Sequence, residues 1–288
     1  MTDQTMSRGA GVALMIASAV MFSSAGLFAK GASASAWDVI FWRGLSSALL
    51  TTLFVAGRRN LASEFAGMGW AGLAAAVIGA SGSVAFISAF KLTSIANVAL
   101  IYAAAPMLAA LLAWAWIGER MSRPVACACV LGFSGVGVIV SGSLGEVRLS
   151  GDLLALWMTV VMAIYLVIYR RYPATPSAGP LVLASVLVLP PALIFGTPFA
   201  NSLSEIAIMA AFGLVFALAS VAMTEGAKRL PSGETALLST LETPMAPVLA
   251  WLVLREVPAL LTVVGGGLIL LGILASQIAE TRRLCRDA

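Results

Sequence analysis

Two charged residues interrupt otherwise apolar stretches of the chain, and they are the first candidates for chemistry. Arg43 stands in Phe41-Trp42-Arg43-Gly44, and Glu242 stands in Leu241-Glu242-Thr243-Pro244. A charged side chain in hydrocarbon costs at least about 2.5–3.5 kcal/mol unless it is paired, protonated or hydrated. Glu242 is therefore either the partner of Arg43 in a structural ion pair or a carboxylate that takes up and releases protons. Arg43 could also bind a carboxylate group through two parallel hydrogen bonds.

Glu242 belongs to a polar stripe on a predicted helix. Thr235, Ser239 and Glu242 follow at spacings of four and three residues, which places them on one helical face. Polar side chains of a membrane helix should face the protein interior rather than lipid. Asn97 is the counterpart of Thr235 in the internal repeat described below, so we expect the two to meet between the copies.

Two prolines fall near the middle of predicted membrane helices. Pro106 and Pro244 each remove one helical hydrogen bond and free the carbonyl four residues earlier, which belongs to Tyr102 and Thr240 respectively. In lipid such carbonyls need partners inside the protein or in a wet cavity. The two helices either line a central pathway or are merely kinked for packing, and the sequence leaves both interpretations open.

Some aromatic residues lie deep in predicted spans rather than at their ends. Trp157, Tyr165 and Tyr102 carry polar atoms that need partners within the bundle, and Ser83 and Phe86 share one helical face. These side chains either line a cavity suited to amphipathic or aromatic solutes or pack between helices.

Several kinds of chemistry are excluded by composition. The chain has no histidine and three cysteines, of which Cys127 and Cys129 are two residues apart on one helix and cannot easily form a disulfide. We expect no metal site, no cofactor and no enzymatic activity, because no reactive cluster of side chains is present. A phosphate-binding Gly-x-x-x-x-Gly-Lys loop is also missing, so ATP cannot act within this chain.

The composition is that of a membrane protein. Hydrophobic residues make up 60% of the chain and charged residues 10%, and the mean hydropathy is +1.00. A span needs about 20 mostly apolar residues. Ten segments qualify and predict an all-α protein: 9–28, 38–57, 67–90, 96–117, 124–141, 151–169, 177–195, 206–227, 232–254 and 258–278.

The distribution of the 17 lysine and arginine residues orients these spans. A cytoplasmic N-terminus places Arg43 within a span and four cations outside, which are Lys30, Lys91, Arg148 and Arg255. The remaining cations fall inside: Arg8, Arg58, Arg59, Arg120, Arg123, Arg170, Arg171, Lys228, Arg229, Arg282, Arg283 and Arg286. The positive-inside rule therefore predicts that both termini are cytoplasmic.

The chain also contains an internal repeat. Pro106-Met107, Trp114 and Glu119 of the first half recur as Pro244-Met245, Trp251 and Glu256 in the second. Ten spans give five to each copy, and an odd number turns the second copy upside down in the membrane. We therefore expect two inverted five-helix repeats, residues 1–145 and 146–288.

These residues resemble the repeat of the drug/metabolite transporter superfamily, in its EamA-type form. The resemblance rests on Pro106 and Pro244 followed by Glu119 and Glu256, on Arg43 in the second span, and on Leu241-Glu242 before Pro244. The family's Leu-Glu-Pro element is interrupted here by Thr243, so the correspondence of Glu242 is looser. Among the branches, the chain is most similar to bacterial exporters of amino acids and aromatic metabolites.

The resemblance implies a secondary transporter that exports small neutral or zwitterionic metabolites, amino acids first, across a bacterial inner membrane by alternating access. Its partners would be a small-molecule substrate and the lipid bilayer, with no nucleic acid, and a monomer would suffice. A multidrug, nucleoside or cofactor carrier of the same superfamily is the alternative within transport. A passive pore is the alternative outside it.

Overall fold

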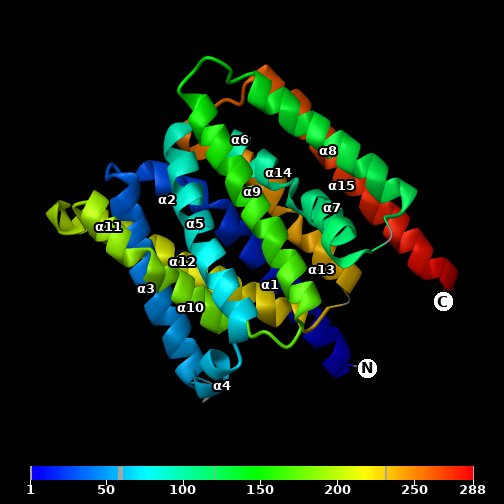
Figure 1. Ribbon diagram of the computed structural model, residues 1–288, viewed down its shortest axis with the longest axis horizontal. Helices are drawn as coiled ribbons and strands as arrows, with labels where there is room; N and C mark the ends of the chain where they lie inside the picture. Colours follow the sequence, from blue (N-terminus) through cyan, green and yellow to red (C-terminus); the bar gives the residue numbers. More distant parts are fainter. Residues whose placement is uncertain (1, 58–60, 120, 231, 288) are drawn as a thin grey trace.

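The computed structural model describes residues 2–57, 61–119, 121–230 and 232–287, and every regular element in these ranges is helical (Figure 1). Arg58, Arg59 and Arg120 of the predicted inner cations lie outside the described residues. In chain order the helices are α1 (Thr2–Ser23), α2 (Ala25–Gly31), α3 (Ala36–Gly57), α4 (Leu61–Ala66), α5 (Gly69–Leu92), α6 (Ile95–Tyr102), α7 (Ala105–Ile117), α8 (Arg123–Ser141), α9 (Arg148–Arg171), α10 (Ala178–Leu187), α11 (Leu189–Phe195), the 3-10 helix η1 (Pro198–Ala200), α12 (Leu203–Ala227), α13 (Ser232–Ser239), α14 (Glu242–Leu254) and α15 (Leu260–Asp287).

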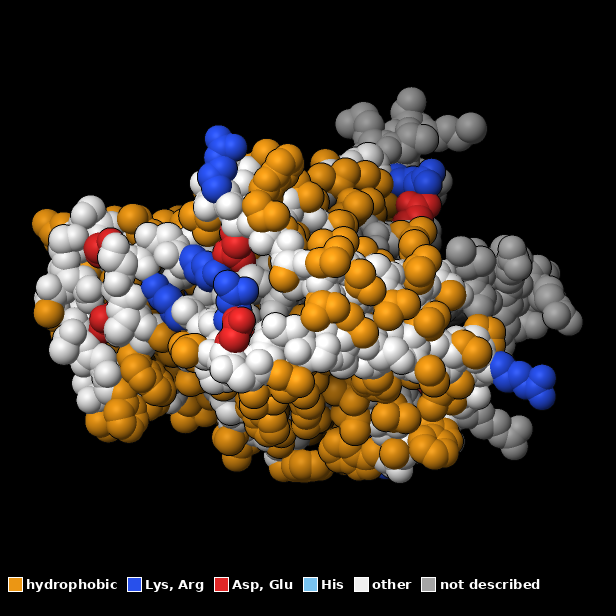
Figure 2. Space-filling view, turned by 90° about the horizontal axis from the view of Figure 1, so that it is seen from above, with side chains coloured by type: hydrophobic (Ala, Val, Ile, Leu, Met, Phe, Trp, Pro, Cys, Tyr) orange, Lys and Arg blue, Asp and Glu red, His pale blue; other side chains and the backbone are white. Residues whose placement is uncertain are grey.

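Nine helical segments of the described chain are long and apolar enough to cross a membrane, and they match the first nine predicted spans. The apolar part of α15, Leu260–Ala275, is shorter than the others, so a tenth span stays a prediction. Large apolar side chains such as Leu53 and Trp116 are exposed, as expected of a surface that faces lipid. Figure 2 shows hydrophobic side chains spread over much of one face, with basic and acidic side chains gathered in a smaller part of it.

Four of the spans are interrupted within their length. The breaks fall at Ser24, at residues 103–104, at Val188 and at residues 240–241. Pro106 and Pro244 lie in the first turns of α7 and α14, where a missing backbone N–H has no cost. The prolines thus begin new helices instead of kinking continuous ones.

The carbonyls near these breaks find local partners, as the loss of helical hydrogen bonds requires. The Thr240 carbonyl accepts the Thr243 N–H at 3.2 Å in a tighter turn. In the first half, the Ile101 carbonyl accepts the Ala104 N–H at 3.1 Å and the Thr159 hydroxyl of α9 at 3.3 Å. The breaks are therefore held by hydrogen bonds inside the protein.

The two halves pack around a pseudo-two-fold axis that passes between α8 and α15. A side chain on Gly135 would meet the Gly265 carbonyl and Ile269, and a side chain on Gly265 would meet the Gly135 carbonyl and Ile139. Because the residue number rises along one helix as it falls along the other, α8 and α15 are antiparallel (Figure 1). These helices correspond in the sequence repeat, so their antiparallel packing is the relation expected of inverted copies.

The other helix contacts repeat in the same paired way. The packing of α1 against α12 has its counterpart in α9 against α5, and that of α3 against α12 in α10 against α5. Likewise α1 packs against α13 and α14 as α9 packs against α6 and α7. The first helix of each half therefore packs among helices of the other half. The interrupted helices of both halves take part in these contacts.

Candidate functional site

Arg43 lies in the middle of α3 with 6% of its surface exposed. Its Nη1 donates a hydrogen bond to the Ser83 hydroxyl of α5 at 2.7 Å, while its buried Nε has no hydrogen-bond partner. No carboxylate of the described chain lies within ion-pair distance of it. The guanidinium group thus retains an unused donor and an uncompensated charge in the interior.

Aromatic rings surround this guanidinium group. Its carbon lies 4.2 Å from the ring centre of Phe216, 5.4 Å from that of Phe212 and 5.9 Å from that of Phe86. Such contacts attract a cation through the ring quadrupole and replace part of its lost hydration. The structure therefore brings the predicted residues Ser83 and Phe86 together with Arg43.

Glu242 begins α14, directly after the break in the ninth span. Its backbone carbonyl accepts a hydrogen bond from the Ser23 hydroxyl at 3.1 Å, and Ser23 precedes the break between α1 and α2. Tyr102, at the end of α6, lies within electrostatic range of the Glu242 carboxylate. Three interrupted spans therefore converge on Glu242, at a helix N-terminus whose dipole favours a negative charge.

The ion pair between Arg43 and Glu242 is not formed. Arg43 instead hydrogen-bonds Ser83 and lies over phenylalanine rings, and the carboxylate of Glu242 lies beyond ion-pair distance of it. The contacts of Arg43 lie on α5 and α12, whereas Glu242 lies on α14. The role of Glu242 as a proton-coupling carboxylate stays a prediction.

The remaining predicted residues fall into two groups. Thr235 and Ser239 lie on α13 in the described part of the ninth span, and Pro106 and Pro244 are exposed beside the breaks. Trp157 is 47% exposed and donates to the Ser81 hydroxyl at 3.3 Å, and Tyr165 fills the space beside Gly79. Both aromatic residues of α9 thus pack against α5, which favours the packing interpretation for them.

Asp152 was missed by the sequence analysis. Its side chain is fully buried in α9 and accepts hydrogen bonds from the Thr93 hydroxyl at 2.6 Å and from Asn97 Nδ2 at 3.0 Å. Asn97 Oδ1 in turn accepts the Thr262 hydroxyl at 2.6 Å, so the amide joins α6 to α9 and α15. A carboxylate placed one residue inside the predicted sixth span was the signal that could have revealed it.

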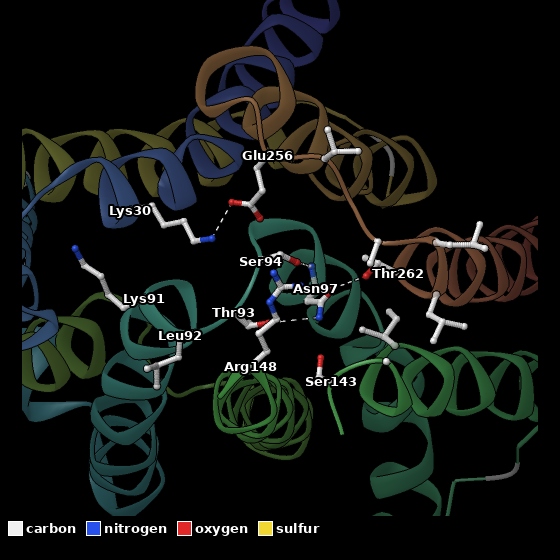
Figure 3. Close-up of a pocket in the computed structure, with 16 residues that line it drawn as sticks. Lys30, Lys91, Leu92, Thr93, Ser94, Asn97, Ser143, Arg148, Glu256 and Thr262 are labelled. Carbon is white, nitrogen blue, oxygen red and sulfur yellow. Dashed lines mark hydrogen bonds and ion pairs between the residues drawn. The ribbon is translucent and has the colours of Figure 1, made fainter. Parts of the chain in front are cut away.

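A polar pocket of about 380 Å³ opens above this network, at the end of the molecule that carries the predicted outer cations (Figure 3). Lys30, Lys91 and Arg148 line it together with Asn97 and Glu256. The Lys30 Nζ lies 2.7 Å from Glu256 Oε2. Within the described ranges no group of three or more histidine, cysteine, aspartate or glutamate side chains is placed to hold a metal ion.

The chain matches known proteins along nearly its whole length. The model of the EamA-like transporter family matches residues 9–141 and 149–276, which are the two halves of the fold. No curated protein matches the sequence. One solved protein crystal structure is similar with a TM-score of 0.65 over 95% of this chain and 98% of its own, and at 18% identity this likeness shows the fold alone. The chain therefore belongs to the EamA-like transporter family of the drug/metabolite superfamily, as a multi-pass membrane protein.

Proposed function

We propose that the protein is a secondary transporter that exports small neutral or zwitterionic metabolites, amino acids first, from the bacterial cytoplasm across the inner membrane. Arg43 carries the proposal, because a buried guanidinium group with an unpartnered Nε and no carboxylate partner is suited to the carboxylate of a bound solute. The surrounding phenylalanine rings would accept the apolar side chain of such a solute. Asn97 and Glu242 belong to the same proposed pathway.

The arrangement of the halves supports the proposal of alternating access. Two antiparallel repeats can exchange conformations around a pathway between them, so that a cavity opens first to one side and then to the other. The interrupted helices supply short segments that can tilt separately at their breaks. Ten spans and cytoplasmic termini complete the proposed topology.

Counterflow in proteoliposomes tests this function directly. Vesicles preloaded with unlabelled amino acids should accumulate one labelled amino acid at a time without any ion gradient, because a carrier exchanges internal solute for external solute. Protein-free vesicles are the control. Saturation and counterflow would distinguish a carrier from a pore, which would show ohmic conductance. Absence of exchange for every amino acid would overturn the substrate class and direct the same assay to drugs and nucleosides.

The substitution Glu242→Gln should separate binding from proton coupling. Glutamine keeps the size and hydrogen-bonding capacity of the side chain but cannot release a proton, so solute binding should persist while stimulation by a pH gradient disappears. Uptake by proteoliposomes with and without the gradient measures this. Glu234→Gln is a matched control, since Glu234 lies on the neighbouring helix α13 and pairs with Arg8 at the surface. If Glu242→Gln leaves the pH response intact, coupling does not occur at this residue.

A further inference from the structure

The polar pocket at the end of α6 has the composition of a site for an anion. Three cations line it, Lys30, Lys91 and Arg148, against one lining carboxylate, that of Glu256. Asp152 lies behind the pocket wall, where Thr93 and Asn97 already donate hydrogen bonds to its carboxylate. Lys91 is engaged by the Ala32 carbonyl at 2.6 Å.

Arg148 remains open to solvent over the pocket. Its side chain is 60% exposed, and its nearest acid, Glu146, is 3.6 Å away at the surface. In Figure 3 the guanidinium group of Arg148 reaches over the pocket toward Asn97. This arginine can therefore approach a solute without first breaking a buried contact.

Glu256 occupies the anion position in this structure. One carboxylate oxygen accepts the Ile95 N–H, the first of α6, at 2.6 Å, and the other is 2.7 Å from the Lys30 Nζ. A lysine together with a helix N-terminus is a favourable setting for a carboxylate. Glu256 follows Arg255, whose φ of 57° is unusual for a residue with a side chain. Glu256 thus shows where a carboxylate binds in this pocket. The backbone conformation of Arg255 that places Glu256 there is itself unfavourable.

A second polar group is available in the same pocket. Ser143 is 2% exposed, and its hydroxyl has no hydrogen-bond partner among the residues that the structure describes. In Figure 3 its oxygen points into the pocket, on the side where Arg148 lies. A hydroxyl that reaches the pocket without a partner in the protein can form hydrogen bonds with a ligand or water there.

From these contacts we infer that the pocket is a second binding station for the carboxylate group of the transported solute, in which Glu256 is an internal competitor. A solute carboxylate displaces Glu256 from Lys30 and from the N-terminus of α6, and Arg148 and Ser143 bind it from the other side. The inference rests on the proposed function for its place in a transport cycle. The binding itself does not depend on transport.

Protection of a cysteine placed in the pocket tests the station. Ala259 lines the pocket and is exposed, so Ala259→Cys in a background without Cys127, Cys129 and Cys285 gives a local reporter. In detergent-solubilised protein, succinate should slow the reaction of this cysteine with a charged maleimide, because bound dicarboxylate covers it. Succinamide, which has the same skeleton without charge, should not.

Three variants determine which residues bind the anion. Glu256→Gln removes the competitor and should lower the half-protecting succinate concentration at least about tenfold, whereas Lys30→Gln should raise it by a similar factor. Arg148→Gln, at an exposed position that does not endanger folding, should raise it about threefold to tenfold. Glu119→Gln is the matched control, because Glu119 pairs with Arg170 elsewhere and should change nothing.

Two results would overturn the station. The first is that succinamide protects the cysteine as well as succinate does. The second is that the half-protecting succinate concentration is the same as in the wild type in both Glu256→Gln and Arg148→Gln. The assay uses protein that is not transporting. Counterflow that fails while protection persists would therefore remove the proposed function and leave the anion site in place.

Discussion

Replacing Arg43 by glutamine is expected to increase the thermal stability of the protein and to remove most of its affinity for amino acids. The guanidinium charge is buried without a carboxylate partner, and its removal should stabilise the fold by about 1–3 kcal/mol, as replacement of buried charges often does. A charge-assisted hydrogen bond to a solute carboxylate contributes about 1.5–3 kcal/mol, so affinity should fall roughly 10- to 100-fold. Thermal unfolding in detergent and labelled amino-acid binding measure the two effects.

Two further substitutions make this expectation specific. Arg43→Lys keeps the charge but not the planar pair of donors, and we expect it to bind solute more weakly than the wild type without becoming more stable. Arg170→Gln, which removes an exposed arginine 2.6 Å from Glu119, should leave binding unchanged. A protein that loses stability in Arg43→Gln and retains its affinity would show that Arg43 is structural.

The second large effect is expected at the helix pair on the pseudo-two-fold axis. Gly135→Ala should destabilise the fold by about 1–3 kcal/mol, because the added methyl group would meet the backbone carbonyl of Gly265, which cannot rotate away as a side chain can. The two helices must then separate. The loss of stability is measured as the fraction of protein that remains folded after heating, by size-exclusion chromatography.

Gly137→Ala provides the control within two residues of the same helix. A methyl group on Gly137 would meet no described atom within 4 Å beyond the adjoining backbone of its own helix, so this variant should be as stable as the wild type or slightly more stable, since alanine favours helix. The double variant Gly135→Ala/Gly265→Ala should lose less stability than the sum of the losses in the two single variants, because the same separation of the helices makes room for both methyl groups. Equal stability of Gly135→Ala and Gly137→Ala would contradict the close packing of α8 and α15.

The helices of the fold could be predicted from the sequence because their signals are local. Apolar runs of about 20 residues predicted ten spans, and nine of them match helical segments of the described chain that are long and apolar enough to cross a membrane. Pro106 and Pro244 lie beside two of the four breaks. The way in which each break is satisfied was not predictable. It depends on contacts between remote segments, such as the Ser23 hydroxyl with the carbonyl of Glu242.

The candidate site was less accessible to sequence reasoning for the same reason. Arg43 and Glu242 were recognised because a charged residue stands out in an apolar stretch of sequence. The ion pair, one of the two roles that the sequence left open for Glu242, is not formed among the described residues. The phenylalanines that surround Arg43 carry no sequence signal, since Phe212 and Phe216 look like any apolar residue of a membrane helix. Asp152 lay too close to the end of a predicted span to stand out.

The reciprocal contact of Gly135 and Gly265 has a consequence for the residues that the two helices can carry. Each glycine is confined by the other's carbonyl, so neither position can take a side chain unless the helices move apart. Two residues further along α8, Gly137 has no such neighbour, and a side chain there would meet open space. The α8–α15 seam therefore restricts both halves of the chain to glycine at one point for as long as the two helices stay in contact.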